Sequence, residues 1–164
     1  MNLIKLSRVL PYLCFSLLAA PLTAGSVRIL QTNSAGDNIH IIDPGTNKVV
    51  GIIKDIEVSH GITYSPDGTR YYVSDEPKET LDVVDAKTLK VIKEIKLSGR
   101  PNNIDRSKDG KRVYVSIIQA PGAIDVIDTA TMTLAKTIKT QGGVHNTYVT
   151  PDGKYVVGGA LNGM

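Results

Sequence analysis

The 164-residue sequence has few of the side chains that stack on nucleic-acid bases or form disulfides. It contains no tryptophan, one phenylalanine and one cysteine, Cys14. Apart from tyrosine, the usual aromatic platforms for base stacking are therefore missing. Runs of like charge are absent as well, and the formal net charge is only +3. These absences argue against a nucleic acid as the partner.

The N-terminal segment has the pattern of a secretory signal peptide. Residues 1–8 are basic and contain no acidic residue, residues 9–20 are almost wholly apolar, and small residues follow in 21–26. A membrane-spanning helix needs about 20 apolar residues, and this run is shorter and is interrupted by proline. We therefore predict a signal peptide over residues 1–24, cleaved after Ala24 or Gly25, and no stable membrane span after its removal.

Removal of this segment changes what chemistry the chain can carry. Cys14 lies inside the apolar run without the usual lipoprotein pattern before it, which argues against a lipid anchor. The mature chain would contain no cysteine, which excludes disulfides, thiolate metal sites and a cysteine nucleophile. It would also lose Lys5 and Arg8, so its net charge would be near +1. We expect a periplasmic or extracellular location.

Two independent markers recur along the chain at intervals of 42 and 43 residues. The first is a pair of β-branched residues followed by aspartate: Ile41-Ile42-Asp43, Val83-Val84-Asp85 and Val126-Ile127-Asp128. The second is an Asp-Gly turn: Pro66-Asp67-Gly68, Lys108-Asp109-Gly110 and Pro151-Asp152-Gly153. A period shared by both markers indicates a repeat architecture.

One repeat unit contains four short predicted strands. In the unit that begins at Gly61, they lie near residues 62–65, 71–74, 81–84 and 89–97, with turn residues between them. Four strands in about 42 residues is typical of one blade of a β-propeller. Leucine-rich and helical repeats have other periods or need a 3.6-residue pattern, and an immunoglobulin-like sandwich has no reason to repeat its turns. We therefore predict an all-β chain with a β-propeller fold.

The repeats also resemble a known family. Tyr72-Val73-Ser74-Asp75 and Tyr114-Val115-Ser116 are similar to the Tyr-Val-Thr-Asn signature of YVTN propeller repeats. This resemblance covers nearly all of residues 27–160 and implies the propeller fold. It implies little about function, because propellers host unrelated activities.

The predicted strands number thirteen, about three blades' worth. We expect a partial propeller over residues 25–164, with units at about 27–59, 60–101, 102–143 and an incomplete one at 144–164. Closed propellers generally have about 4 to 8 blades. We therefore expect a fragment of a roughly seven-bladed parent, or, less favoured, closure by oligomerisation. Open β-edges promote aggregation, so the isolated chain is expected to be unstable or oligomeric.

One position of the repeat predicts an arc around the mouth of the central channel. It precedes each Asp-Gly aspartate by seven residues and holds His60, Asn102 and His145. Such side chains could contact a metal, a haem or an anionic ligand, with Arg100 nearby as an anion contact. The resembling family often has Pro-His here, and the middle unit keeps Pro101 without the histidine, which weakens a metal ring. The competing interpretation is that these side chains bond loop backbone or water.

The repeated aspartates are predicted to be structural. Asp43, Asp85 and Asp128 each have a threonine three residues later, and we expect every one to accept hydrogen bonds from the following backbone. We expect the same of the Asp-Gly aspartates. No Gly-x-Ser-x-Gly motif is present, and Gly142-Gly143 and Gly158-Gly159 lack a phosphate-loop context. No catalytic residue, metal ligand or cofactor is therefore assigned.

Two functions from different classes remain. The first is an exported, non-catalytic binding scaffold for an envelope protein, a polymer or a small ligand. The second is an enzyme or redox module with its site at the channel mouth, because similar propellers occur in lactonases, in amine-dehydrogenase subunits and beside haem in nitrite reductases. A degenerate fragment without activity is the remaining alternative.

Overall fold

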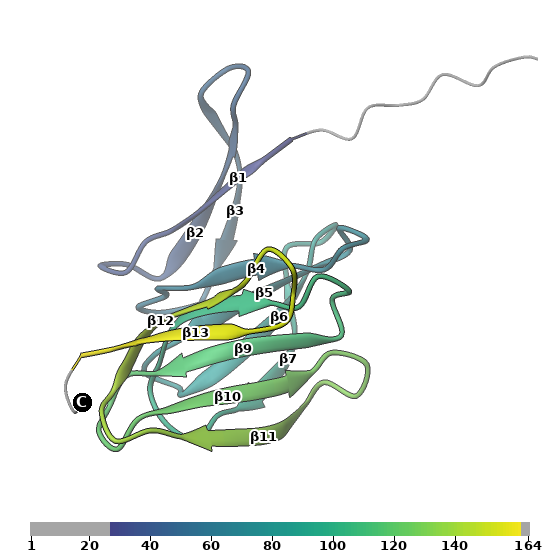
Figure 1. Ribbon diagram of the computed structural model, residues 1–164. Helices are drawn as coiled ribbons and strands as arrows, with labels where there is room; N and C mark the ends of the chain where they lie inside the picture. The colour runs from purple at the N-terminus through teal and green to yellow at the C-terminus, as the bar shows by residue number, and fades with distance from the viewer. Residues whose placement is uncertain (1–26, 162–164) are drawn as a thin grey trace, which may run out of the picture.

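The computed structural model describes residues 27–161, so the predicted signal peptide lies outside the described residues. This part of the chain contains thirteen β-strands and no helix, hence none that could cross a membrane. The strands form four antiparallel sheets in chain order, which we call blades 1 to 4 (Figure 1). The thirteen predicted strands and the all-β prediction are confirmed.

The two middle blades each have four strands that follow one another in space as in the sequence. Blade 2 contains β4 (Ile62–Tyr64), β5 (Arg70–Asp75), β6 (Thr80–Asp85) and β7 (Val91–Lys96). Blade 3 contains β8 (Pro101–Arg106), β9 (Arg112–Ile117), β10 (Ala123–Asp128) and β11 (Thr133–Lys139). Within each of these blades the chain reverses direction after each of the first three strands, so that every strand pairs with the one that follows it. This is the order expected of one propeller blade.

The outer two blades have fewer strands within the described residues. Blade 1 consists of β1 (Ile29–Thr32), β2 (Asn38–Asp43) and β3 (Lys48–Lys54). Blade 4 consists of β12 (Val144–Val149) and β13 (Val156–Ala160). By the repeat, β1 corresponds to β5, so blade 1 has no described counterpart of β4 or β8.

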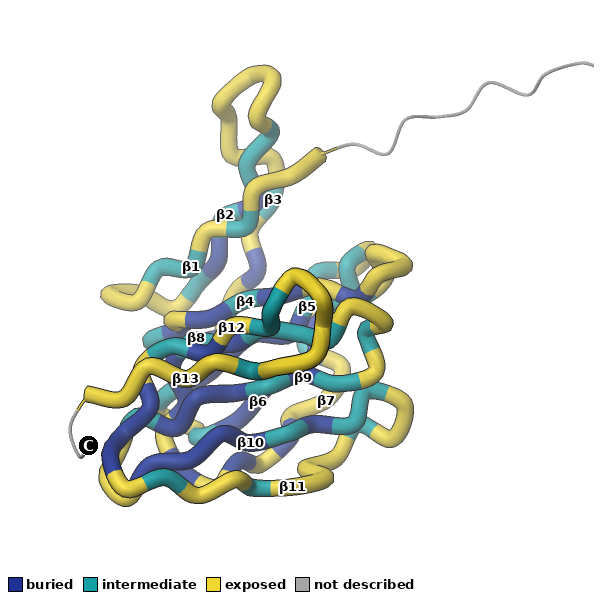
Figure 2. Tube along the Cα trace, in the orientation of Figure 1, coloured by how far each residue is buried: buried dark blue, intermediate teal, exposed yellow. Residues whose placement is uncertain are grey.

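Successive side chains of a strand point to opposite faces of the sheet, so one strand contributes to the hydrophobic cores on both sides of its blade. In β5, Val73 faces a cluster shared with blade 1, whereas its neighbour Tyr72 faces a cluster shared with blade 3. The first cluster also contains Ile39 and Ile53, which are fully buried. Burial is therefore concentrated between the sheets, whereas β11 and β13 are largely exposed (Figure 2).

The first strands of blades 2, 3 and 4 lie next to one another. Asn103 Oδ1 of β8 accepts a hydrogen bond from the Thr147 main-chain N–H of β12 at 3.1 Å. Asp105 Oδ2 of β8 accepts one from Val149 N–H at 2.7 Å. Gly61, just before β4, lies so close to the Asn102 carbonyl that a Cβ there would approach it to 2.7 Å. We therefore call β4, β8 and β12 the inner strands.

Candidate functional site

The candidate site lies on the face where the chain passes from one blade to the next. Three connections reach this face, at residues 55–61, 97–100 and 140–143, and the β5–β6 loop at 76–79 joins them. We call it the connection face. It lies at the starts of the inner strands, where the repeat places His60, Asn102 and His145.

The structure brings two of the predicted residues together through a third that the sequence did not reveal. Glu76 Oε2 lies 3.1 Å from His60 Nε2, and Glu76 Oε1 lies 3.5 Å from Arg100 Nε. The Glu76 side chain is only 17% exposed, whereas that of Arg100 is 51% exposed. One nearly buried carboxylate therefore lies between two basic groups supplied by successive connections.

Asn102 and His145 are not part of this ion-pair cluster. Asn102 is the second residue of β8 and is buried, with 4% of its surface exposed. His145 is exposed, and its Nδ1 lies 3.0 Å from Asn146 Oδ1. In residues 27–161, no group of three His, Cys, Asp or Glu side chains is arranged to hold a metal ion.

Hydroxyl groups at one repeat position fix the backbone of the arc. Ser74 Oγ accepts from the Gly61 N–H at 2.9 Å and from the His60 N–H at 3.3 Å. Ser116 Oγ lies 2.5 Å from the Asn103 carbonyl oxygen and 3.1 Å from that of His145. Since each hydroxyl is fully buried, these bonds hold the starts of the inner strands in place.

The connection that carries Arg100 is held from blade 3. Asp125 Oδ2 accepts the Ser98 N–H at 2.7 Å, and Asp125 Oδ1 accepts the Ser98 hydroxyl at 2.9 Å and the Thr137 hydroxyl at 2.7 Å. Gln119 Oε1 accepts the Arg100 N–H at 3.3 Å. Arg100 is thereby fixed at its main chain, and its side chain extends from an anchored segment towards Glu76.

A second group of carboxylates lies buried behind the β5–β6 loop. Asp75 and Asp82 are fully buried, and an oxygen of each, Oδ2, has no hydrogen bond within the described chain. Lys78 Nζ lies 3.4 Å from the first oxygen and 4.0 Å from the second, and it also pairs with Glu94 at 2.9 Å. Burial, with a contribution from the Asp75 charge, raises the pKa of Asp82 to about 6.

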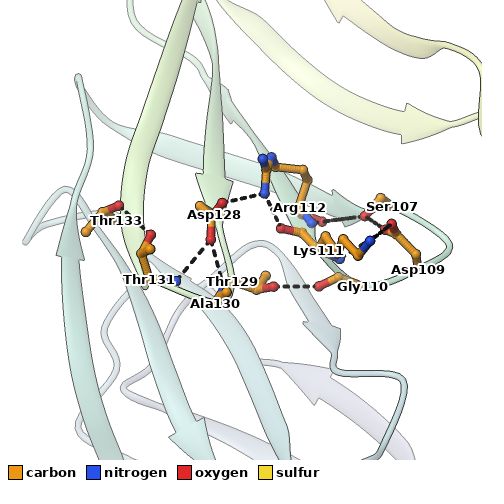
Figure 3. Close-up of polar contacts among 10 residues, drawn as sticks. All are labelled: Ser107, Asp109, Gly110, Lys111, Arg112, Asp128, Thr129, Ala130, Thr131 and Thr133. Carbon is orange, nitrogen blue, oxygen red and sulfur yellow. Dashed lines mark hydrogen bonds and ion pairs between the residues drawn. The ribbon is translucent and has the colours of Figure 1, made fainter.

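The repeated turn aspartates have the structural role that the sequence predicts. Asp128 Oδ1 accepts the main-chain N–H groups of Ala130 at 2.9 Å and Thr131 at 3.0 Å, while Arg112 pairs with Oδ2 (Figure 3). Asp109 accepts the Ser107 hydroxyl and the Lys111 N–H in the neighbouring turn. Such hydrogen bonds hold the pKa values of Asp109 and Asp128 below the usual range.

Glu76 gave no recognisable signal in the sequence. It lies in a loop whose counterpart in blade 3 contains Ile118 and Gln119, so the repeat does not mark it. The one feature that could have indicated Glu76 is that, in such a blade, the β5–β6 loop reaches the same face as the connections between blades. Asp82 was equally hidden, because the sequence shows it only as a polar residue within a strand.

Comparison with known proteins identifies the fold. No family model and no curated protein matches the chain. The chain is similar in structure to hydrazine synthase of Kuenenia stuttgartiensis, with a TM-score of 0.74, 33% sequence identity and coverage of 82% of this chain and 38% of that chain. It is also similar to dihydro-heme d1 dehydrogenase NirN in complex with DHE, with a TM-score of 0.66, 20% identity and coverage of 81% and 30%.

Both structures are β-propeller proteins, so the chain has a β-propeller fold. It spans less than half of the length of either one. The YVTN assignment remains a resemblance, since no family model supports it.

Proposed function

We propose that the chain belongs to an exported, non-catalytic binding scaffold that holds a carboxylate-bearing ligand or partner at the channel mouth. The observation that carries this proposal is the position of the Glu76 carboxylate between His60 and Arg100. These two basic groups already hold one carboxylate supplied by the protein. The partner would be an envelope protein, a polymer or a small ligand in the periplasm or at the cell surface.

In the cluster of His60, Glu76 and Arg100, the solvent-facing part of the Arg100 guanidinium can still bind an anion. A guanidinium carries five N–H donors in a planar fork, and the contact of Arg100 with Glu76 is made through Nε. Half of the Arg100 side chain is exposed, so its remaining donors can meet an incoming carboxylate in bidentate geometry. Glu76 competes for the same positive charge, so its removal should favour an external anion.

The test is a titration of the 15N-labelled full-length chain with succinate as the carboxylate probe. We expect saturable shifts at the His60 and Arg100 signals, and about tenfold tighter binding in Glu76→Gln, which keeps the side-chain shape and removes the competing charge. Arg100→Ala should abolish the shifts. The matched control is Glu79→Gln, which removes a carboxylate from the same loop that pairs instead with Lys96. Absence of saturable shifts in both the wild type and Glu76→Gln would refute the proposal.

A redox module is the second candidate, favoured by the similarity to hydrazine synthase and to NirN in complex with DHE. Haem ligation needs an imidazole nitrogen without a competing partner. His60 uses Nε2 on Glu76, whereas the exposed His145 uses only Nδ1, on Asn146. If haem binds through Nε2, the nitrogen by which histidine ordinarily ligates haem iron, His145 is the one of these two residues that fits it.

This candidate is tested by titrating the full-length chain with haem and recording the Soret band. Binding that is lost in His145→Ala and kept in His60→Ala would support a haem contact at blade 4. Binding that is absent, or unchanged in both variants, would remove the redox interpretation for this part of the propeller.

A further inference from the structure

The last strand of blades 1, 2 and 3 forms the outer edge of its sheet. We call these strands, β3, β7 and β11, the outer strands. Each contains two lysines, whereas the other strands of residues 27–161 contain none. The six are Lys48, Lys54, Lys93, Lys96, Lys136 and Lys139. Glu94 is the one acidic residue of the outer strands. Since the whole chain has 19 basic and 16 acidic residues, positive charge is concentrated along this edge.

Most of this charge has no partner within the described residues. Glu94 pairs at 2.9 Å with Lys78 of the β5–β6 loop, so it neutralises no lysine of the outer strands. Lys96 pairs with Glu79, also at 2.9 Å. The other five lysines of the outer strands are exposed and make no ion pair in residues 27–161. The outer edge therefore attracts anions, most strongly at low salt.

A β-bulge at one repeat position of each outer strand places a further side chain beside the lysines. In β3 the bulge leaves Val50 without a residue opposite it in β2. The residues left in the same way are Ile92 of β7 and Ala135 of β11. A bulge re-aims the side chain of the residue that it adds. Val50 is 55% exposed and Ile92 is 51% exposed, although both are apolar.

Protection of the sheet edge does not explain this combination. Lysines and bulges both prevent an edge strand from pairing with another chain. That role accounts for the lysines, but a half-exposed valine or isoleucine at the bulge promotes the association that the lysines oppose. Lysines beside exposed aliphatic side chains are instead typical of surfaces that lie at the interface of a membrane with anionic lipid.

A cavity of about 570 Å³ lies between the outer strands of blades 1 and 2. Apolar side chains of β3 and β7 line it, together with Lys54 and Lys90, which make no ion pair within the described chain. Two acidic residues also line it, Glu94, which is paired with Lys78, and Asp55. Two lysines beside an apolar wall suit the phosphate of a lipid head group and the start of its acyl chain.

We propose that the outer edge of blades 1 and 2 docks on the surface of a membrane rich in anionic lipid. This contact is peripheral, and it is independent of carboxylate binding at the connection face. The lysines of β3 and β7 attract the lipid phosphates, and Val50 and Ile92 enter the head-group region. The contact centres on these two strands because they flank the cavity and carry the large bulge residues, whereas β11 has alanine at that position.

Two other occupants fit the outer edge less well. A soluble polyanion would pair with the lysines and leave Val50 and Ile92 in water. A second copy of the chain, docked edge to edge, would place lysines against lysines, and like charges that lie opposite each other are destabilising. Only an anionic lipid surface uses both the charge and the apolar side chains.

The first experiment measures sedimentation of the full-length chain with vesicles of phosphatidylglycerol or of phosphatidylcholine. We expect tighter binding to phosphatidylglycerol, weakened by added salt. Lys54→Gln combined with Lys90→Gln should weaken this binding about tenfold or more. The matched control, Lys111→Gln with Lys154→Gln, removes the same charge from turns outside the outer strands and should bind like the wild type. Residues 1–24 are the same in every variant, so the differences report the outer edge.

A second experiment identifies the side chains that enter the lipid. An environment-sensitive dye is attached to a single cysteine, Val50→Cys or Ile92→Cys, in a chain that also carries Cys14→Ser. Phosphatidylglycerol vesicles should shift the dye emission to the blue at both positions. At Tyr155→Cys the emission should not change, because this residue is 68% exposed in blade 4, away from the outer strands.

Three outcomes overturn the proposal. The first is equal vesicle binding by the wild type and the variant with Lys54→Gln and Lys90→Gln. The second is a dye that does not shift at Val50 and Ile92, or that shifts equally at Tyr155. The third is binding to soluble dextran sulfate as tight as binding to the vesicles, without a shift at Ile92, which would identify a polyanion as the partner.

Discussion

Asp125 in β10 holds Ser98 in the connection between blades 2 and 3, accepting both its N–H at 2.7 Å and its hydroxyl at 2.9 Å. The carboxylate is fully buried and also accepts the Thr137 hydroxyl. A buried charge is tolerated when hydrogen bonds satisfy it. This one connects two adjacent blades and anchors the segment that carries Arg100.

We therefore expect Asp125→Ala to be strongly destabilising, by about 2–4 kcal/mol, because it leaves buried donors without an acceptor. Thr137→Val removes one of the three hydrogen bonds and should cost about 1 kcal/mol. Urea denaturation followed by circular dichroism measures both values. A cost for Asp125→Ala no larger than that for Thr137→Val would show that the contact to Ser98 contributes nothing.

Pro66, in the turn after β4, lies directly against Gly110 in the turn after β8, and this contact leads to a second prediction. Gly110→Ala should destabilise by about 1–2 kcal/mol from positive φ and by about 1–3 kcal/mol more from overpacking against Pro66. Gly68→Ala carries the same backbone strain, with φ of 70° against 71°, and its added methyl meets no atom of the described chain. The difference between their urea midpoints isolates the packing contribution. Equal midpoints would contradict the contact.

The strands were largely predictable because two local signals agree along the chain. Alternation of apolar residues and the repeated Asp-Gly turn each depend on near neighbours in sequence, so both can be read from it. The strand predicted near residues 81–84 spans Thr80–Asp85 in the structure, whereas the one predicted over residues 89–97 is limited to Val91–Lys96. The end of a strand depends on tertiary pairing, which local pattern does not specify.

The ion-pair cluster could be predicted only in part, for a related reason. His60 lies at the predicted start of an inner strand because the repeat fixes the backbone there. Its pairing with Glu76 joins two loops of different lengths and sequences, and Arg100 comes from a third segment. Loop conformation places these side chains, and the repeat carries no information about it.

The predicted signal peptide supplies a third prediction, for residues outside the described part of the chain. Expressed in a Gram-negative host, the protein should be recovered from the periplasm with a mature N-terminus at Gly25 or Ser26, because the apolar run directs export and the small residues permit cleavage. Intact-mass spectrometry of the periplasmic fraction measures this. Leu17→Arg should interrupt the apolar run and leave the precursor in the cytoplasm. An intact Met1 on exported protein would contradict cleavage.

Asp82 and Asp125 occupy the same position of the repeat and are both fully buried, yet their surroundings differ. Ser98 and Thr137 donate to Asp125. The residues equivalent to these donors near Asp82 are Ile56, whose side chain cannot donate and whose main-chain N–H bonds the Asp37 carbonyl oxygen, and Glu94, which carries a like charge. Thr80 alone donates to Asp82, at 2.6 Å, and the second carboxylate oxygen has no hydrogen bond within the described residues. The backbone therefore repeats at these two positions, whereas the hydrogen bonds made by the two carboxylates differ.

This difference predicts an unusual dependence of stability on pH. The pKa of Asp82 is about 6 in the folded chain against an ordinary value of 3.8, so between these pH values the folded state binds more protons than the unfolded state. Stability contributed by this group is therefore present below pH 3.8 and is lost as pH rises to about 6. The loss amounts to about 3 kcal/mol, on the basis of about 1.4 kcal/mol per pKa unit.

Asp82→Asn should remove this loss, because the amide does not ionise and still accepts from Thr80. Relative to wild type at the same pH, the variant should gain stability between pH 4 and 7, measured as the difference in urea midpoints. Asp67→Asn is the control of opposite sign. The Ser65 and Thr69 hydrogen bonds lower the pKa of Asp67 to about 2, so its contribution is present above pH 3.8 and lost as pH falls towards 2. If the difference in urea midpoint between Asp82→Asn and the wild type does not change with pH, the charge of Lys78 fully compensates that of the buried Asp82 carboxylate, and the prediction is wrong.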